Sequence, residues 1–531
     1  MFLDLRQMPT GTTLDADLCI IGAGAAGITI ARQFVGRPVG VIVVESGGLD
    51  LDDDTQALYQ GKIVGHPYFD LDITRLRYFG GSTNHWGGWC APLHELDFAV
   101  RDWVPHSGWP VPRADLDSYY ATAQTLVEIG PPTYDPREWQ DAKHRFPEFL
   151  PDQMVTQIMQ LSEPATHFGE RYRADLEKAD NVRVLLNANA LGIDSNDTAT
   201  VATGLRLATL TGISANVRAK VVVVACGGIE SPRVLLLSNT VVPAGLGNAN
   251  DLVGRFFMEH PHIVTGSLLA TDAGPWHHGL SERFYKNGTL IQAVIATSPA
   301  AQQSQRTLGY SANFETPVVG NAGYPAYRHL RDAIADGTMP DHLAQDVWNL
   351  VTGLSDAAHG IFGTSPQDPY HPPYDLSRPI RLFTRLEQCP NPDSRVMLIA
   401  ERDALGLNRI ALDWRFTELD KQSLRRSQAL IGAEFGRLGV GRFKYDDWVL
   451  ADDTSWPDEL LGGHHHMGTC RMSDDPKSGV VDRDCRVHGM DNLYVAGSAV
   501  YPTSGYVNPT LTVVTLALRL ADHLKIRFGV A

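Results

Sequence analysis

The sequence predicts an α/β fold, in which a doubly wound Rossmann-like domain carries an inserted α+β domain built on an antiparallel sheet. Three observations lead to this class. A glycine-rich turn lies between two short apolar runs within residues 18–44. Apolar runs of the same kind recur in the middle and near the end of the chain. The blocks between them contain segments with a period-two alternation, which is typical of antiparallel strands.

The first domain begins with a βαβ unit. We expect a strand at residues 18–21, a helix at 28–35 and a second strand at 39–44. Short β-branched runs predict further strands of the same buried sheet, at residues 182–186, 220–224 and 492–496. Apolar residues at helical spacing predict a helix over residues 511–524 near the C-terminus.

Long blocks of different composition separate these strands. We therefore expect a discontinuous nucleotide-binding domain made of residues 1–110, 180–262 and 453–531. Residues 111–179 and 263–452 are predicted to form the substrate-binding domain and its cap segments. Alternating patterns in this second domain predict strands at residues 292–297, 395–399 and 409–414.

Composition narrows the function classes. The 531 residues carry a formal net charge of −16, which argues against nucleic acid as a partner, because phosphate binding needs basic surface. The six cysteines show no Cys-x-x-Cys spacing, so we expect reduced thiols in a cytoplasmic protein. The N-terminus lacks the apolar core of a secretion signal, and no apolar run reaches bilayer length. Direct membrane insertion is therefore not expected.

The glycine-rich turn reads Gly22-Ala23-Gly24-Ala25-Ala26-Gly27. Gly22 allows a tight turn, Gly24 lets the backbone approach a pyrophosphate, and Gly27 lets the helix pack on the strand. The phosphates would lie at the helix N-terminus, where free N–H groups favour negative charge. Glu45 ends the second strand, at the spacing of the acid that bonds the adenosine ribose. This motif predicts a bound dinucleotide and does not separate FAD from NAD.

A second loop, at residues 77–89, surrounds aromatic residues and His85 with four glycines. Because glycine has no Cβ, such a loop can follow a bulky planar cofactor closely. The segment resembles the flavin-contacting loop of the glucose-methanol-choline oxidoreductases, and this resemblance selects FAD. In some members a histidine at this place is bonded covalently to the flavin, whereas others hold FAD without the bond. The resemblance places His85 near the flavin and leaves both forms open.

Three consecutive histidines follow Gly462-Gly463 and precede Met467-Gly468-Thr469. Consecutive side chains do not converge on one point, so we expect no metal site here. The family pattern puts a catalytic histidine three residues before the glycine of the Gly-Thr pair. Counting back from Gly468, the resemblance implies that His465 is the general base.

The C-terminal segment resembles the same family, and its Asn-Pro-Thr-Leu-Thr variant is similar to pyranose oxidases and sugar dehydrogenases. Many members have a second histidine where this chain has Asn508. From the residues alone, Pro509 suits the first position of a helix and Asn508 suits its cap. The helix from Thr510 would point its positive end at the flavin and stabilise negative charge on the ring.

The similarity covers essentially the whole chain and implies an enzyme with bound FAD that oxidises the hydroxyl of a pyranose or glycoside. The two catalytic residues are His465 as base and Asn508 as a hydrogen-bond partner of the reacting oxygen. Oxygen, a quinone or a protein would accept the electrons. The implied cofactor contacts are Gly22, Gly24, Ala25, Ala26, Gly27, Glu45, Gly80, Gly81, Ser82, Asn84, His85, Gly88, Ala190, Ala225, Gly497, Ser498, Asn508, Pro509 and Thr510.

Three alternatives remain open at this stage. The glycine turn alone is compatible with an NAD-dependent dehydrogenase. The family framework is also compatible with a catalytically silent member that binds FAD, although His465 and Asn508 are both retained. Within the flavoenzyme class, a non-sugar alcohol such as an aryl alcohol is the second candidate substrate, because a fold does not fix a substrate.

Overall fold

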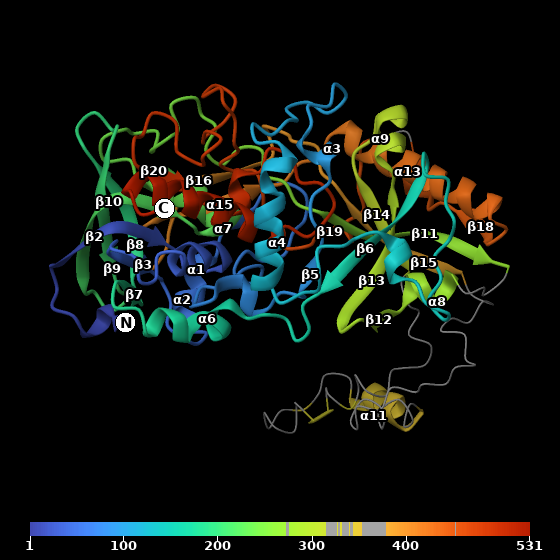
Figure 1. Cartoon of the computed structure of the whole chain (residues 1–531), viewed down its shortest axis with the longest axis horizontal. Coiled ribbons are helices and arrows are strands. Elements are labelled where there is room, and N and C mark those ends of the chain that lie inside the picture. The colour runs from blue at the N-terminus through green and yellow to red at the C-terminus, as the bar shows by residue number, and fades with distance from the viewer. Residues whose placement is uncertain are drawn as a thin grey trace.

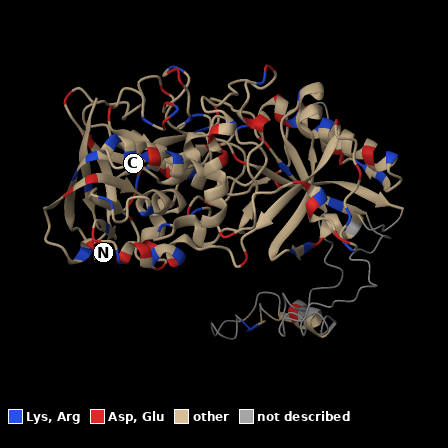
Figure 2. Ribbon diagram, viewed as in Figure 1, with Lys and Arg blue, Asp and Glu red and all other residues tan. Residues whose placement is uncertain are grey.

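The computed structural model describes residues 1–271, 276–314, 327, 330–331, 339, 343–352, 379–451 and 453–531. Two large sheets lie side by side along the long axis of the molecule, and helices α4 (Asp117–Leu126) and α15 (Thr510–Phe528) lie between them (Figure 1). Acidic and basic residues are interspersed along the ribbon in both halves of the molecule (Figure 2). No helix in the described ranges has the length and apolar character needed to span a membrane.

The first sheet has eight strands in the order β1-β7-β3-β2-β10-β9-β8, with β20 added beside β10. The pairs from β1 to β10 and the β10–β20 pair are parallel, whereas β9 and β8 are added antiparallel. Its strands are β1 (Phe2–Asp4), β2 (Thr12–Ile21), β3 (Val41–Val44), β7 (Val182–Leu186), β8 (Asn189–Ser195), β9 (Ala202–Ala208), β10 (Ser214–Val224) and β20 (Leu493–Val495).

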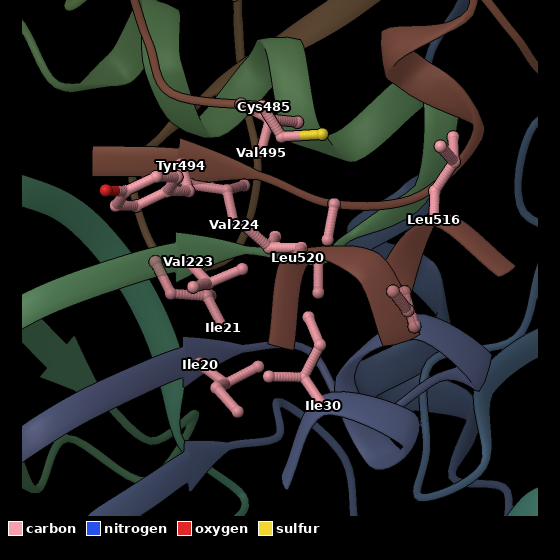
Figure 3. Packing of buried hydrophobic residues seen from close by; sticks show 14 of the residues in the cluster. Ile20, Ile21, Ile30, Val223, Val224, Cys485, Tyr494, Val495, Leu516 and Leu520 are labelled. Atoms are coloured by element: carbon pink, nitrogen blue, oxygen red, sulfur yellow. The ribbon is translucent and has the colours of Figure 1, made fainter. Parts of the chain in front are cut away.

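The central parallel strands β2 and β10 are buried and apolar at their carboxyl ends, where helices cover them. Helices α1 (Ala25–Arg32), α7 (Gly227–Leu237) and α15 supply the covering side chains. Figure 3 shows Ile20, Val223 and Tyr494 from three neighbouring strands in one cluster with Ile30 and Leu520 from two helices. The predicted βαβ unit is present, and α1 begins at Ala25, directly after the glycine turn and three residues before the predicted start.

The second sheet has nine antiparallel strands in the order β18-β11-β15-β14-β13-β6-β5, with β12 beside β13 and β19 beside β11. Helix α13 (Glu418–Arg437) packs Leu424, Ile431 and Phe435 against one face. The strands are β5 (Trp89–Cys90), β6 (Met154–Leu161), β11 (Pro261–Ala270), β12 (Arg283–Lys286), β13 (Thr289–Thr297), β14 (Tyr310–Phe314), β15 (Ile380–Leu386), β18 (Gly441–Lys444) and β19 (Leu461–Gly462).

Two predicted features of the second domain differ from the structure. The strands predicted at 395–399 and 409–414 are β16 (Arg395–Arg402) and β17 (Asn408–Asp413), and they form a separate three-stranded sheet with β4 (Lys62–Ile63). Strand β13 does not alternate, since all nine of its residues are buried. Ile291, Ala293 and Ile295 pack toward α13, whereas Val294 and Ala296 join the core of the first sheet.

The strands of the first sheet all lie within residues 1–110, 180–262 and 453–531. The structure differs from the predicted division in residues 111–179, because α4 packs on α15 and α6 (Phe168–Glu177) packs on α1. Their apolar sides, with Tyr120, Ala123 and Phe168, complete the core under the first sheet. Conversely, the short strands β5 and β19 lie in the predicted nucleotide-binding ranges but pair into the second sheet.

The glycine turn leaves no room for a side chain at Gly27, because a Cβ there would collide with the carbonyl oxygen of Gly22. We predict that Gly27→Ala destabilises the protein by about 1–3 kcal/mol, the usual cost of overpacking. The matched control is Gly436→Ala on the open side of α13, where a Cβ meets nothing within 4 Å. That control should be neutral or stabilising by up to about 1 kcal/mol. Thermal unfolding measures both changes, and a Gly27→Ala protein as stable as the parent would contradict the packing argument.

Candidate active site

A deep cavity opens at the carboxyl ends of β2, β3 and β10, which is where ligands bind in open parallel sheets. It extends toward the second sheet as far as Trp89 on β5. Segments that are far apart in the chain converge on its wall. The predicted cofactor and catalytic residues on this wall are Gly22, Gly24, Ala25, Ala26, Glu45, Gly81, Ser82, His85, Ala190, Ala225, His465, Gly497, Ser498, Asn508, Pro509 and Thr510.

Four predicted cofactor contacts, Gly27, Gly80, Asn84 and Gly88, do not line the cavity. Gly27 lies behind the turn, against Gly22. The Asn84 side chain donates a hydrogen bond to the carbonyl oxygen of Phe79, 3.0 Å away, and so closes the loop on itself. Gly80 and Gly88 also allow this loop to pack closely, since a Cβ at either position would collide with neighbouring atoms.

Helices α1, α7 and α15 begin on the cavity wall. None of the three has a side-chain cap, so their first N–H groups remain available to an anionic or electron-rich ligand. The prediction that Asn508 caps α15 is wrong. The N-cap residue is Pro509, and the carboxamide of Asn508 turns instead to His465.

Glu45 directly follows β3 and is buried, with a relative exposure of 5%. It accepts hydrogen bonds from the backbone N–H groups of Ala23 (2.9 Å) and Gly47 (3.0 Å). These bonds fix the carboxylate at the cavity wall beside the glycine turn. A carboxylate has about four lone-pair positions, so it can still accept hydroxyl groups of a ribose.

The three consecutive histidines point in three directions. His464 is exposed and lies at the edge of Phe69, with ring centroids 4.6 Å apart. His466 is buried and contacts the hydroxyl of Tyr68 through Nε2 at 2.9 Å. His465 points toward Asn508 and His260. The three imidazoles therefore do not converge on one point.

A chain of hydrogen bonds assigns the protons of His465. His260 Nε2 faces the carbonyl oxygen of Ser504 at 3.3 Å and must donate to it, which leaves His260 Nδ1 as an acceptor. His465 Nδ1 lies 2.9 Å from that nitrogen and donates to it. The lone pair of neutral His465 is therefore on Nε2, which lies 3.1 Å from Asn508 Nδ2 on the cavity wall.

These imidazoles are held in their neutral form. Burial, reinforced by neighbouring histidines, lowers the pKa of His465 well below its usual range. Burial lowers the pKa of His260 to about 4 and that of His262 well below the ordinary value. A neutral imidazole with a directed lone pair can accept a proton from a ligand hydroxyl.

A buried carboxylate, Glu259, fixes the backbone that carries His465. It accepts hydrogen bonds from Tyr68 Oη, the Gly463 N–H and the His260 N–H, each at 2.8 Å, and also from the His465 N–H. Burial raises the pKa of Glu259 to about 7. No local pattern could have shown this role, because three of the four donors are about 200 residues away in the chain.

The second sheet turns a polar face toward this site. His262 on β11 pairs directly with Arg385 on β15, and Arg385 pairs with Ser311 on β14. Directly opposed residues of antiparallel strands project from the same face. The ring of His262 lies 5.8 Å from the ring of His465, so this face adjoins His465. Gln157 on β6 contributes a further amide and accepts a hydrogen bond from Tyr506 at 3.4 Å.

Comparisons with known proteins agree with this architecture. A family model described as "FAD dependent oxidoreductase" matches residues 17–247, and one described as "GMC oxidoreductase" matches residues 390–517. The chain is 25% identical to 6'''-hydroxyparomomycin C oxidase of Streptomyces lividus, over 96% of this chain and 92% of that protein. It is 24% identical to paromamine 6'-oxidase of Streptomyces fradiae, over 95% and 90% of the two chains. A shorter match, over 23% of this chain and 22% of that protein, is 36% identical to C-glycoside 3-oxidase of Microbacterium trichothecenolyticum.

Solved structures show the same fold. A formate oxidase superposes with a TM-score of 0.55 over 98% of this chain and all of the other, at 16% identity. A pyridoxine 4-oxidase superposes with a TM-score of 0.52 over 96% and 99% of the two chains, also at 16% identity. The arrangement of a nucleotide-binding domain beside a large antiparallel sheet is thus shared.

Since Glu259 accepts four donors, we predict that Glu259→Gln destabilises the protein by about 1–3 kcal/mol for each N–H that it leaves unpaired. A glutamine presents its own N–H₂ group to at least one donor. The control is Glu401→Gln on β16, a half-exposed carboxylate 3.1 Å from Lys62, which should change stability by less than about 1 kcal/mol. Thermal unfolding separates the two, and equal effects would show that Glu259 does not hold this loop.

Proposed function

Because this chain is an FAD-dependent oxidoreductase of the glucose-methanol-choline family, we propose that it oxidises a hydroxyl group of a pyranose or glycoside to a carbonyl, with His465 as the base. One observation carries the proposal. The lone pair of a neutral, half-buried imidazole lies beside a carboxamide on the wall of a nucleotide-binding cavity, next to a polar sheet face.

The residues present fit FAD. Gly24 and Gly497 leave open space where a Cβ would project, so the backbone can approach a bound group closely. We assign the glycine turn and the N-terminus of α1 to the pyrophosphate, and Glu45 to the ribose. Pro509 and Thr510 would lie against the ring system, with His85 on the same wall. When bound, FAD supplies the ring nitrogen that accepts a hydride.

In the proposed reaction, His465 Nε2 accepts the proton of the substrate hydroxyl as a hydride leaves the carbon that bears this hydroxyl. In the structure Asn508 Nδ2 donates to the Nε2 lone pair of His465. The substrate hydroxyl would take this place, and Asn508 Nδ2 would then donate to the reacting oxygen and hold it near the base. His465 Nδ1–H stays bonded to His260 and prevents the ring from turning. Orienting groups of this kind can lower a barrier by several kcal/mol, since the reacting atoms are already aligned.

The face opposite the base favours a polyhydroxylated substrate. Arg385, Asn313 and Gln157 offer donors and acceptors from three strands of this sheet (β15, β14 and β6), and each is half-buried rather than fully exposed. The ring of Phe383, on the same face, provides an apolar surface against which a sugar ring can lie. Relatives named paromamine 6'-oxidase and C-glycoside 3-oxidase support a sugar or glycoside as the substrate.

We predict that His465→Ala retains FAD but slows anaerobic flavin reduction by sugar at least about a hundredfold, the contribution of a general base. His464→Asn is the matched control, because asparagine tolerates the left-handed backbone at that position (φ 60°) and His464 points away from the base. Stopped-flow bleaching of the flavin measures both rates. If aryl alcohols bleach the parent and no sugar does, the substrate is a non-sugar alcohol. If His465→Ala reduces its flavin at the rate of the parent, His465 is not the base.

The low pKa of His465 also predicts the pH dependence of the first half-reaction. A base acts only when it is deprotonated, and burial lowers its pKa well below 6.5. The kcat/KM for flavin reduction should therefore stay level from pH 8 to about 6.5 and decline only in more acidic buffer. The rapid-reaction pH profile tests this, and a decline centred at or above pH 6.5 would contradict it.

A further inference from the structure

Arg385 on β15 is half-buried and, among the residues that the structure describes, has no carboxylate partner, in contrast to Arg101 and Arg233. Arg101 binds Glu387 at 2.5 Å, and Arg233 binds Asp403 at 2.5 Å. Among the residues that the structure describes, the guanidinium of Arg385 has one hydrogen-bond acceptor, Asn313 Oδ1, at 2.8 Å. That acceptor is a neutral amide, so the charge of Arg385 is not balanced within the site.

Aromatic rings hold this guanidinium in a fixed place. Its carbon lies 4.8 Å from the ring centroid of Trp89 and 4.8 Å from that of Phe383. Trp89 lines the cofactor cavity, and Phe383 lies 5.2 Å from the ring of His262. Arg385 therefore stands at the junction between the cavity and the polar sheet face. A guanidinium has five N–H donors, and most of them remain available here.

The charges around Arg385 are predominantly positive. Arg283 places a second cation 5.1 Å from the ring of Trp89. The pKa of Arg385 is lowered to about 10 by burial and by Arg283, so the group is still protonated at pH 7. Its charge in turn contributes to the low pKa of His465. The nearby acids are already engaged, Glu387 with Arg101 and Glu259 with the loop that carries the base.

We propose that Arg385 binds a carboxylate on the substrate, so that the enzyme prefers acidic sugars to neutral sugars and discriminates most strongly against cationic amino sugars. This inference rests on the proposed sugar oxidation and specifies its substrate class. A planar guanidinium can bind a carboxylate through two parallel hydrogen bonds, and the bound anion would supply the missing counter-charge. An ammonium group at the same place would meet two cations.

The test compares glucuronate, glucose and glucosamine as reductants of the flavin, with the parent, Arg385→Gln and Arg385→Lys. For the parent we expect kcat/KM to be highest with glucuronate and lowest with glucosamine. Hydrogen bonds to charged groups contribute about 1.5–3 kcal/mol, so Arg385→Gln should reduce the glucuronate-to-glucose ratio by about 10- to 150-fold. The loss should fall on KM, because Arg385 holds a group remote from the reacting carbon. Arg385→Lys should restore part of the ratio, since it keeps the charge but loses the planar fork.

Arg381→Gln is the matched control. Arg381 projects from the same strand and face, but it is paired with Asp446 at 2.9 Å. Its substitution should leave the substrate ratio unchanged, and the flavin absorbance of each variant reports correct folding. An unchanged ratio in Arg385→Gln, or a parent that prefers glucosamine, would overturn the assignment while leaving sugar oxidation intact. If no sugar bleaches the parent, the proposed function itself is wrong, and the role of Arg385 falls with it.

Discussion

The contact between His260 and His465 is the interaction on which the active site depends. It joins residues 205 positions apart, one at the start of β11 in the second sheet and the other in a loop at the cavity wall. The carbonyl oxygen of Ser504 fixes the proton of His260, and His260 in turn fixes the proton of His465. A shift of the segment before β11 relative to this loop would break this sequence of donors and acceptors. The tautomer of His465 therefore depends on the packing of distant segments as well as on one side chain.

Local sequence predicted the parts of the fold that depend on local physics. The strand at residues 182–186 was predicted with the bounds that β7 has, and the glycine turn lies between β2 and α1 as expected. The strands at 395–402 and 408–413 were predicted as strands but assigned to the wrong sheet, because alternation does not identify the pairing partner. The continuous burial of β13 was also missed. A strand that separates two cores loses its polar face, and only the packing on both sides shows this.

The candidate site likewise contains residues that local sequence predicted and residues that it did not. Most predicted contacts lie on one cavity wall, since glycine turns and helix N-termini act through the backbone and leave clear motifs. Glu259, His260 and Arg385 left no comparable signal. The role of Glu259 comes from N–H groups that fold around it, and that of Arg385 comes from the absence of an acid among its described neighbours. Asn508 was expected to cap α15. Pro509 is the N-cap residue instead, and the carboxamide of Asn508 contacts the imidazole of His465.

Burial that keeps His465 neutral also makes its protonated form costly, so the site must stabilise the imidazolium when the proton arrives. The His465 ring donates its Nδ1–H to His260 Nδ1, and such a bond strengthens when the donor becomes charged. Glu259 acts on the backbone of the same loop. One carboxylate oxygen accepts the backbone N–H of His465, and the other accepts those of His260 and Gly463. The buried carboxyl group thus fixes the position of the imidazole, while His260 fixes its orientation and its tautomer.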